Sequence, residues 1–330
     1  MARAIYGRVT NQSGTPVNGA KVEAWDSDWP GDDDRMGVVY TDANGNYELH
    51  YHDGHWDTAP HNITTWRPDI YVTASVKNNN GDWVKLEKSK IYKDHKLKED
   101  LKIDLVLPIS QAISKRTDFQ VSQYAFQFPN SFSIDNLIPD ITGPWKMGLC
   151  GGMSAGALHR FNHKCAVPTQ SVTPASGSPL YEELLERQLV TLSDGVLGKI
   201  FEWTQAPDVP HTHTIESIRQ RQKAEWPILQ SYIDAGKPAI LCLIRAEGYF
   251  ADITKNHQVL ALGYEYLPTT RDLKVEIYDP NDKYGSNFLS LSLSGGRLGA
   301  KQFDSSGAPI NCRGFFVAST TKASAKKHYS

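Results

Sequence analysis

The chain has 330 residues, enough for two domains of ordinary size, and 40% of them are hydrophobic, enough for packed cores. A formal charge of −2 at pH 7, with lysines and arginines scattered along the chain, argues against a nucleic-acid partner. No apolar run approaches the roughly 18 residues that cross a bilayer, so we expect no membrane span.

The N-terminus, residues 1–6, runs directly into strand-like sequence without the apolar segment of a signal peptide. We therefore expect a cytoplasmic protein or one exported without a cleavable leader, and the sequence leaves both open.

Residues 1–110 predict an all-β domain. Turn signals such as Asn18-Gly19 and the segment 42–46 separate short runs with the pattern of half-buried strands. Strands spaced this closely, with no helical pattern among them, predict a β-sandwich. The expected strands are 5–10, 20–25, 47–51, 69–74 and 103–107.

A dense acidic loop follows the second of these strands. Carboxylates at close spacing suit Ca²⁺, but the loop lacks the residue order and the closing glutamate of an EF-hand. A solvated acidic loop is the alternative, and we favour it. The carboxylates concerned are Asp26, Asp28, Asp32, Asp33 and Asp34. We expect no cofactor.

Residues 111–119 predict a linker, and residues 120–330 predict a second domain with a different pattern. Ser178 and Pro179 begin a helix, and a later helix ends at Gly236. The first of these helices has an apolar stripe of Leu180, Leu184, Leu185 and Leu189. Strands are then expected at 239–244, 258–266, 274–279, 288–293 and 315–317. Helices followed by an antiparallel sheet indicate an α+β fold.

A cysteine lies in a glycine-rich turn at residues 148–154 that opens a helix. Met153, Ala157 and Phe161 recur one turn apart and predict the buried face, which places Cys150 at the helix N-terminus. The neighbouring glycines allow close backbone approach and unusual dihedrals. A helix N-terminus favours an anion, either a thiolate or the oxyanion of a tetrahedral intermediate. A structural cysteine in a turn is the alternative for this residue taken alone.

A histidine and an acid follow at the ends of predicted strands. A thiol at its ordinary pKa of about 8.5 is mostly protonated at neutral pH, so thiolate chemistry needs an imidazole and a group that orients it. His257 and Asp279 supply these two groups, and Pro280 holds the acid in extended backbone. Asn281 is the alternative orienting residue, because a strand's alternation would place it on the same side.

Three motifs in this order resemble those of papain-like cysteine peptidases. They are Gly-Leu-Cys-Gly-Gly-Met at 148–153, Asn-His-Gln-Val-Leu at 256–260 and Tyr-Asp-Pro-Asn at 278–281. The resemblance covers residues 120–320 and is to a bacterial subgroup, and double-glycine leader peptidases of bacteriocin exporters similarly use an Asp-Pro acid. It implies that Cys150 is the nucleophile, that His257 acts as base and then acid, and that Asp279 orients the ring.

One position departs from that family. Papain-like enzymes usually carry a glutamine six residues before the cysteine, which donates to the oxyanion, and here Pro144 occupies that position. Gln127 and Asn130 are the upstream amides that could replace it, with Asn130 preferred, although an asparagine after a proline is equally typical of a turn. The backbone N–H of Cys150 is the other expected donor.

The first domain resembles transthyretin-like and carboxypeptidase-regulatory-like sandwiches. The shared motifs are Gly-Arg-Val at 7–9, the turn and strand at 14–22, and Thr-Asp-x-x-Gly-x-Tyr at 41–47. This fold implies no single function. A protein or cell-wall partner for the domain is therefore only a hypothesis.

For the other cysteines and for two histidines, the sequence predicts neither a catalytic role nor metal binding. Cys242 lies in an apolar run and predicts a buried structural thiol, and Cys312 is a weaker case of the same kind. His159 and His163 are four residues apart, close to Cys165, but no HExxH glutamate or fourth ligand accompanies them. We expect no zinc site.

Together these patterns predict a thiol hydrolase that cuts a peptide or related amide bond through an acyl-enzyme thioester. An acyl transferase of the transglutaminase type would use the same three residues. A binding or delivery protein, with a sandwich that docks a partner and an inert second domain, is the alternative from another class. Because a catalytic domain is joined to an accessory sandwich without a leader peptide, a secreted bacterial effector that acts on peptidoglycan cross-links or host proteins is a further hypothesis.

Overall fold

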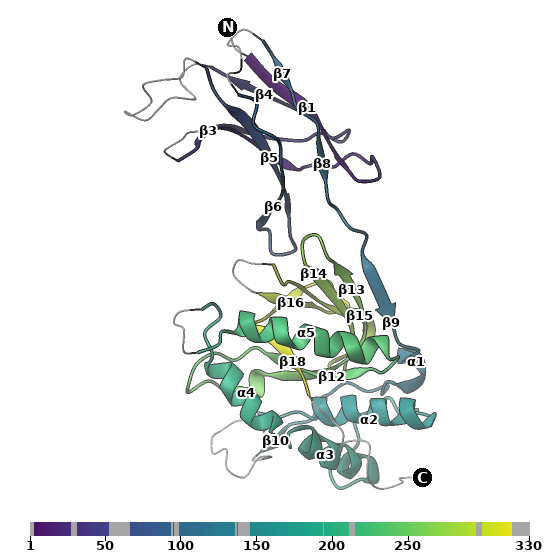
Figure 1. The fold of residues 1–330 in the computed structure, drawn as a ribbon. Helices are drawn as coiled ribbons and strands as arrows, with labels where there is room; N and C mark the ends of the chain where they lie inside the picture. The colour runs from purple at the N-terminus through teal and green to yellow at the C-terminus, as the bar shows by residue number, and fades with distance from the viewer. Residues whose placement is uncertain are drawn as a thin grey trace. The chain divides into compact units, whose positions relative to one another are not determined.

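The computed structural model describes residues 3–27, 32–52, 67–93, 95, 99–135, 137, 146–193, 195–210, 215–294 and 299–318. The chain is a mixed α+β protein (Figure 1). It divides into two compact units, residues 1–111 with 267–271 and residues 112–266 with 272–330.

Two four-stranded sheets make up the described part of the first unit. One has the strand order β4-β1-β7 with β8 also paired to β1, and the other has the order β3-β2-β5-β6 (Figure 1). The strands are β1 Arg3–Asn11, β2 Lys21–Asp26, β3 Asp34–Tyr40, β4 Asn46–Tyr51, β5 Ile70–Lys77, β6 Trp83–Lys88, β7 Leu101–Lys102 and β8 Leu105–Leu107.

The two sheets share one apolar core. Ile5 and Leu49 from the first sheet and Val22 and Val72 from the second belong to it. In β4, buried and exposed residues alternate along the strand, as expected for a sheet with one face toward a core. The arrangement is compatible with the predicted β-sandwich. Of the strand expected at 103–107, only residues 105–107 form one, β8, which pairs with β1. Strand β7 lies just before that segment, and β3 and β6 are not among the expected strands.

All helices in the described residues belong to the second unit. They are α1 Val121–Tyr124, α2 Cys150–His163, α3 Pro179–Thr191, α4 Val196–Gln205, α5 Ile218–Asp234 and the short 3₁₀ helix η2 Ile253–Lys255. Helix α3 begins as predicted, because the Ser178 hydroxyl accepts the N–H of Tyr181. Helix α5 ends just before Gly236, whose φ of 72° closes it. The predicted stripe of α3 is wrong at Leu189, which is exposed. Among the described helices, none has the length and apolar character needed to cross a membrane.

An eight-stranded sheet forms the centre of this unit. Its order is β17-β16-β15-β14-β13-β12-β18, with β9 also paired to β13. Its strands are β9 Ile113–Arg116, β12 Ala239–Ile244, β13 His257–Leu267, β14 Asp272–Asp279, β15 Asp282–Ser292, β16 Ala300–Phe303, β17 Pro309–Cys312 and β18 Gly314–Val317. A separate pair joins β10 Ile134–Asp135 to β11 Lys146–Met147.

The segment predicted as a linker belongs to this unit instead. Strand β9 lies within residues 111–119 and pairs with β13, and Phe119 is fully buried. The sequence predicts that all strands of this sheet follow the helices. Strands β12 to β18 do so, whereas β9 precedes the helices.

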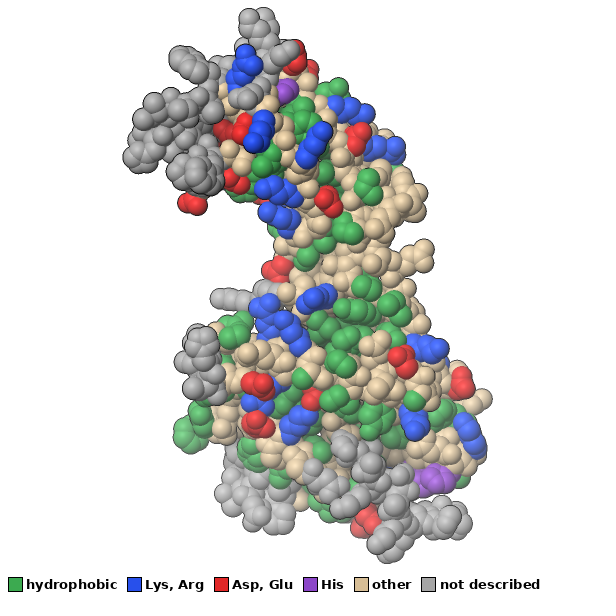
Figure 2. Space-filling model, viewed as in Figure 1, with side chains coloured by type: hydrophobic (Ala, Val, Ile, Leu, Met, Phe, Trp, Pro, Cys, Tyr) green, Lys and Arg blue, Asp and Glu red, His purple; other side chains and the backbone are tan. Residues whose placement is uncertain are grey.

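Helices pack on both faces of the sheet, and β12 shows why. Ile240 and Cys242 join one apolar core with residues of α2 and α4, whereas Leu241 and Leu243 join another with residues of α5 (Figure 1). A strand covered on both faces carries an unbroken apolar run, as the sequence of β12 does. This packing places the start of α2 against the sheet. On the face shown in Figure 2, acidic and basic side chains are intermixed.

Candidate active site

Cys150 is the first residue of α2, and its side chain is partly exposed. The N–H groups of a first helical turn have no acceptor within the helix, and the N-cap residue Leu149 supplies none from its side chain. The amide oxygen of Gln188, from α3, instead accepts the N–H of Gly152 at 2.9 Å. A neighbouring helix therefore caps the helix that carries the cysteine.

Gly151 and Gly152 are required by packing. A Cβ on Gly151 would lie 1.7 Å from Oε1 of Gln258, and one on Gly152 would lie 2.0 Å from the carbonyl oxygen of Leu184. The expected close backbone approach is therefore confirmed. The expectation of unusual dihedrals is wrong for these two residues, because both lie inside α2.

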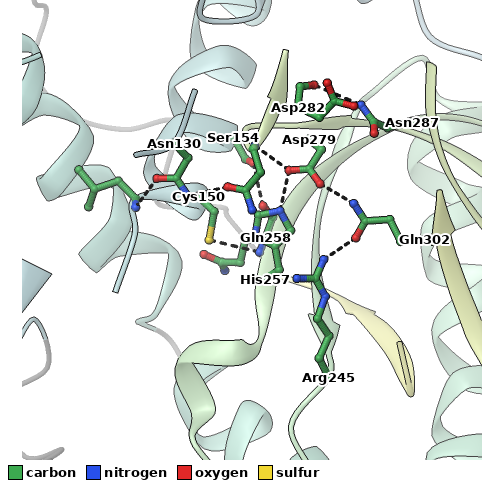
Figure 3. Close-up of polar contacts among 12 residues, drawn as sticks. Asn130, Cys150, Ser154, Arg245, His257, Gln258, Asp279, Asp282, Asn287 and Gln302 are labelled. Atoms are coloured by element: carbon green, nitrogen blue, oxygen red, sulfur yellow. Dashed lines mark hydrogen bonds and ion pairs between the residues drawn. The ribbon is translucent and has the colours of Figure 1, made fainter. Parts of the chain in front are cut away.

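Gln258 connects the cysteine to the adjacent helix. Its backbone N–H donates to Sγ of Cys150 at 3.4 Å (Figure 3). Its side-chain Oε1 accepts from the Thr191 hydroxyl at 2.9 Å, and its Nε2 donates to the Thr191 carbonyl at 3.3 Å. Both side chains are buried. The backbone N–H of Gln258 thus stabilises negative charge on the Cys150 sulfur. This role does not depend on the side chain, so the residue type does not predict it.

His257 opens β13 and Asp279 closes β14, and these strands are neighbours in the sheet. Nε2 of His257 lies 2.7 Å from Oδ1 of Asp279, and both side chains are buried (Figure 3). Because Nε2 faces the carboxylate, Nδ1 is the ring nitrogen left for Cys150, whose sulfur interacts electrostatically with the imidazole. The structure therefore brings the three predicted residues together.

Their mutual charges shift all three pKa values. Burial raises the pKa of Cys150, but the His257 charge and two hydrogen bonds outweigh it and lower the pKa below its ordinary value. Burial lowers the pKa of His257, but Asp279 and Cys150 raise it to about 9. Burial likewise raises the pKa of Asp279, and the imidazolium with other hydrogen bonds brings it below its usual range. These directions favour a thiolate beside an imidazolium.

Asn281 does not face the histidine. Strand β14 ends at Asp279, so the alternation expected to carry Asn281 to the same side stops there. The exposed Asn281 donates its backbone N–H to Oδ1 of Asp279 at 2.8 Å. Its side chain accepts from Nδ2 of Asn130 at 2.9 Å.

The two amides proposed for the oxyanion have other partners. Oδ1 of Asn130 accepts the N–H of Leu149 at 2.9 Å, and its backbone N–H donates to the carbonyl of Pro280 at 2.9 Å (Figure 3). Asn130 therefore connects the cysteine turn to the segment after Asp279. Gln127 is exposed and donates Nε2 to the carbonyl of Ala125 at 3.1 Å. Pro144 lies outside the described residues.

Sequence reasoning missed two residues behind the acid. Gln302 of β16 donates Nε2 to Oδ2 of Asp279, and Arg245, just after β12, donates Nη2 to Oε1 of Gln302 at 2.5 Å (Figure 3). Each is a single polar residue beside or within a strand, a pattern that carries no functional signal. Only the order of strands in the sheet reveals their place.

The described residues contain no group of three His, Cys, Asp or Glu side chains placed to hold a metal ion. In the acidic loop, Asp26 accepts the N–H of Asp69 at 2.6 Å and Asp33 accepts the Tyr71 hydroxyl at 2.6 Å. Asp28 lies outside the described residues. The calcium hypothesis therefore gains no support from this part of the chain.

The remaining thiols differ from Cys150. Burial raises the pKa of Cys242, in β12, well above the ordinary value, and raises that of Cys312 to about 11. Both are buried, as predicted for structural thiols. Cys165 is exposed. The rings of His159 and His163 are in contact, with centroids 4.2 Å apart and ring planes tilted by 34°.

No known family model and no curated protein matches this chain. Among solved structures, the dioxygenase domain of a dioxygenase and carbohydrate-binding protein fusion from Streptomyces sp. SirexAA-E is similar at 15% identity and a TM-score of 0.22, covering 33% of this chain and 80% of that one. A 9R-lipoxygenase from Cyanothece PCC8801 is similar at 11% identity and a TM-score of 0.24, covering 97% of this chain and 42% of that one. Similarities this weak carry no argument about fold or function.

Proposed function

We propose that the protein is a thiol hydrolase that cleaves a peptide or related amide bond, with a papain-like second unit and a transthyretin-like first unit as accessory. One observation carries the proposal. A partly exposed cysteine at a helix N-terminus interacts electrostatically with a histidine whose Nε2 lies 2.7 Å from a buried carboxylate. This set of groups activates a sulfur nucleophile.

In the first step, Sγ of Cys150 attacks the substrate carbonyl carbon, and the carbonyl π-electrons move to oxygen. When this tetrahedral intermediate collapses, the C–N bond breaks and the imidazolium of His257 gives its proton to the departing amine. The product of this half-reaction is a thioester on the cysteine and a free amine. Asp279 stabilises the imidazolium and fixes the ring.

In the second step, water attacks the thioester carbonyl while neutral His257 accepts its proton. The C–S bond then breaks, releasing a carboxylic acid and regenerating the thiolate and imidazolium pair. The oxyanion in both steps would be stabilised by the N–H of Cys150, which has no acceptor within α2 because it is the first helical residue.

The first test is selective alkylation with iodoacetamide at pH 6, followed by mass spectrometry of each cysteine peptide. Cys150 should be labelled well ahead of Cys165, the exposed thiol that serves as an internal control. The proposal is wrong if the two are labelled at equal, slow rates, because an inert second unit would behave in this way.

The second test compares the wild type with Cys150→Ala on peptide libraries and cell-wall fragments. We expect new amine and carboxylic-acid termini only with the wild type. Adding a primary amine at high concentration separates hydrolysis from acyl transfer, since a transferase would yield a new amide in place of the acid.

A further inference from the structure

The carboxylate of Asp279, which orients His257, accepts a further hydrogen bond on its second oxygen. Its second oxygen, Oδ2, accepts a hydrogen bond from Nε2 of Gln302, and Gln302 accepts one from Nη2 of Arg245 at 2.5 Å (Figure 3). Gln302 is fully buried on β16. Arg245 is partly exposed. A chain of contacts therefore runs from the Arg245 guanidinium to the Cys150 sulfur through the amide, the carboxylate and the imidazole.

The direction of this chain is determined by hydrogen-bond chemistry. A guanidinium has donors and no acceptor, so the side of the Gln302 amide that faces Arg245 must be the oxygen. The NH₂ group then faces Asp279. Because an ionised carboxylate only accepts hydrogen bonds, this donor stabilises the ionised form of Asp279. Without the guanidinium, the amide could rotate and present its oxygen to the carboxylate, which is repulsive.

We propose that Arg245 and Gln302 are positioning residues that keep Asp279 ionised and aligned, and that thereby hold Cys150 and His257 as a thiolate and imidazolium pair. This inference rests on the proposed function. Neither residue contacts the reacting atoms. Their effect reaches the sulfur because an ionised Asp279 stabilises the imidazolium, and the imidazolium stabilises the thiolate.

Two further titratable side chains lie near this chain of hydrogen bonds. Burial raises the pKa of Tyr278, which adjoins Asp279, far above neutrality. Burial also raises the pKa of Cys312, which lies in the field of Arg245, to about 11. Both remain neutral from pH 6 to 9. Asp282 pairs with Asp279 across β14 and β15 and is a further acidic residue near these contacts, and it is unchanged in every variant compared below.

The test is the pH profile of Cys150 alkylation by iodoacetamide, from pH 5 to 10, in the intact protein. It needs no substrate. We expect Gln302→Met and Arg245→Met to be alkylated about tenfold more slowly than wild type at pH 6, the size of one hydrogen bond to a charged group. Rates should converge at pH 10, where every form is a thiolate. Arg245→Lys, which keeps a positive donor, should restore most of the rate.

Gln222→Met is the matched control. Gln222 is a fully buried glutamine of α5 whose Oε1 accepts the N–H of Phe315 at 2.7 Å, so this change costs a buried hydrogen bond elsewhere in the same unit. Its alkylation profile should match wild type. If Gln302→Met does not fold, the two Arg245 variants decide the question, because Arg245 is partly exposed and its replacement perturbs the core less.

The outcomes are distinct. Profiles that overlay wild type in Gln302→Met and Arg245→Met, with Cys150 still reactive at pH 6, overturn the positioning role and leave the proposed function intact. A wild-type Cys150 that reacts no faster than Cys165 at pH 6 overturns both. A shift seen equally in Gln222→Met shows a general loss of packing and also overturns the inference.

Discussion

The amide oxygen of Gln188 accepts the N–H of Gly152 at 2.9 Å, so α3 caps the helix that begins with Cys150. A serine or aspartate at the N-cap is the usual solution, but Leu149 occupies that position. The first turn of α2 also contains no acidic residue. A neutral amide caps the helix without placing a second negative charge beside the thiolate, where a carboxylate would raise the cysteine pKa.

The first prediction concerns the close packing of this helix. Gly151→Ala should destabilise the fold by about 1–3 kcal/mol, because the added methyl would displace Gln258 from Thr191. Gly198→Ala in α4 is the control, since a Cβ there meets nothing within 4 Å. It should stabilise by about 0.5–1 kcal/mol through helix propensity. Urea unfolding measures both, and equal stability of the two variants would contradict the packing argument.

The second prediction separates the two upstream amides. Asn130→Ala removes the acceptor for the Leu149 N–H and the donor to Asn281, so the cysteine turn should loosen. We expect kcat/KM, or the rate of Cys150 alkylation at pH 6, to fall about tenfold. Gln127→Ala should stay within about twofold, because this side chain is exposed and donates to the carbonyl of Ala125. A fall in kcat/KM with Gln127→Ala and none with Asn130→Ala would contradict this prediction and would assign the oxyanion role to Gln127.

The third prediction is the pH dependence of stability. The pKa of His257 is raised to about 9 in the folded protein, against an ordinary value of about 6.5, so its stabilising contribution is complete below about pH 6.5 and is lost as pH rises toward 9. The pKa of Asp279 is lowered, so its contribution is complete above about pH 4 and is lost as pH falls further. The pair therefore stabilises the fold most between about pH 4 and 6.5.

Asp279→Asn measures this contribution. The free energy of unfolding, compared between wild type and variant by urea titration, should differ most near pH 5 to 6 and converge toward pH 10. A difference that stays constant across that range would mean that the two side chains do not share an ion pair.

Much of the second unit could be predicted because its signals are local. The cap of α3 at Ser178, the end of α5 at Gly236 and the unbroken apolar run of β12 each follow from a few consecutive residues. The burial of Met153 and Phe161 follows from helical spacing in the same way. Strand β9 was missed because it is exposed and short, so it has no apolar pattern, and only its pairing with β13 defines it.

The residues of the site also fall into two groups, those predictable from local sequence and those placed by tertiary packing. The sequence by itself determined the order of thiol, imidazole and acid and the elements that carry them, because each lies in a distinctive local motif. Only the tertiary structure decided that Gln188 caps α2, that Asn130 connects the cysteine turn to the acid segment, and that Gln302 binds Asp279. These partners come from separate helices and strands, and a single buried amide acquires its role from what the sheet order and helix packing place opposite it.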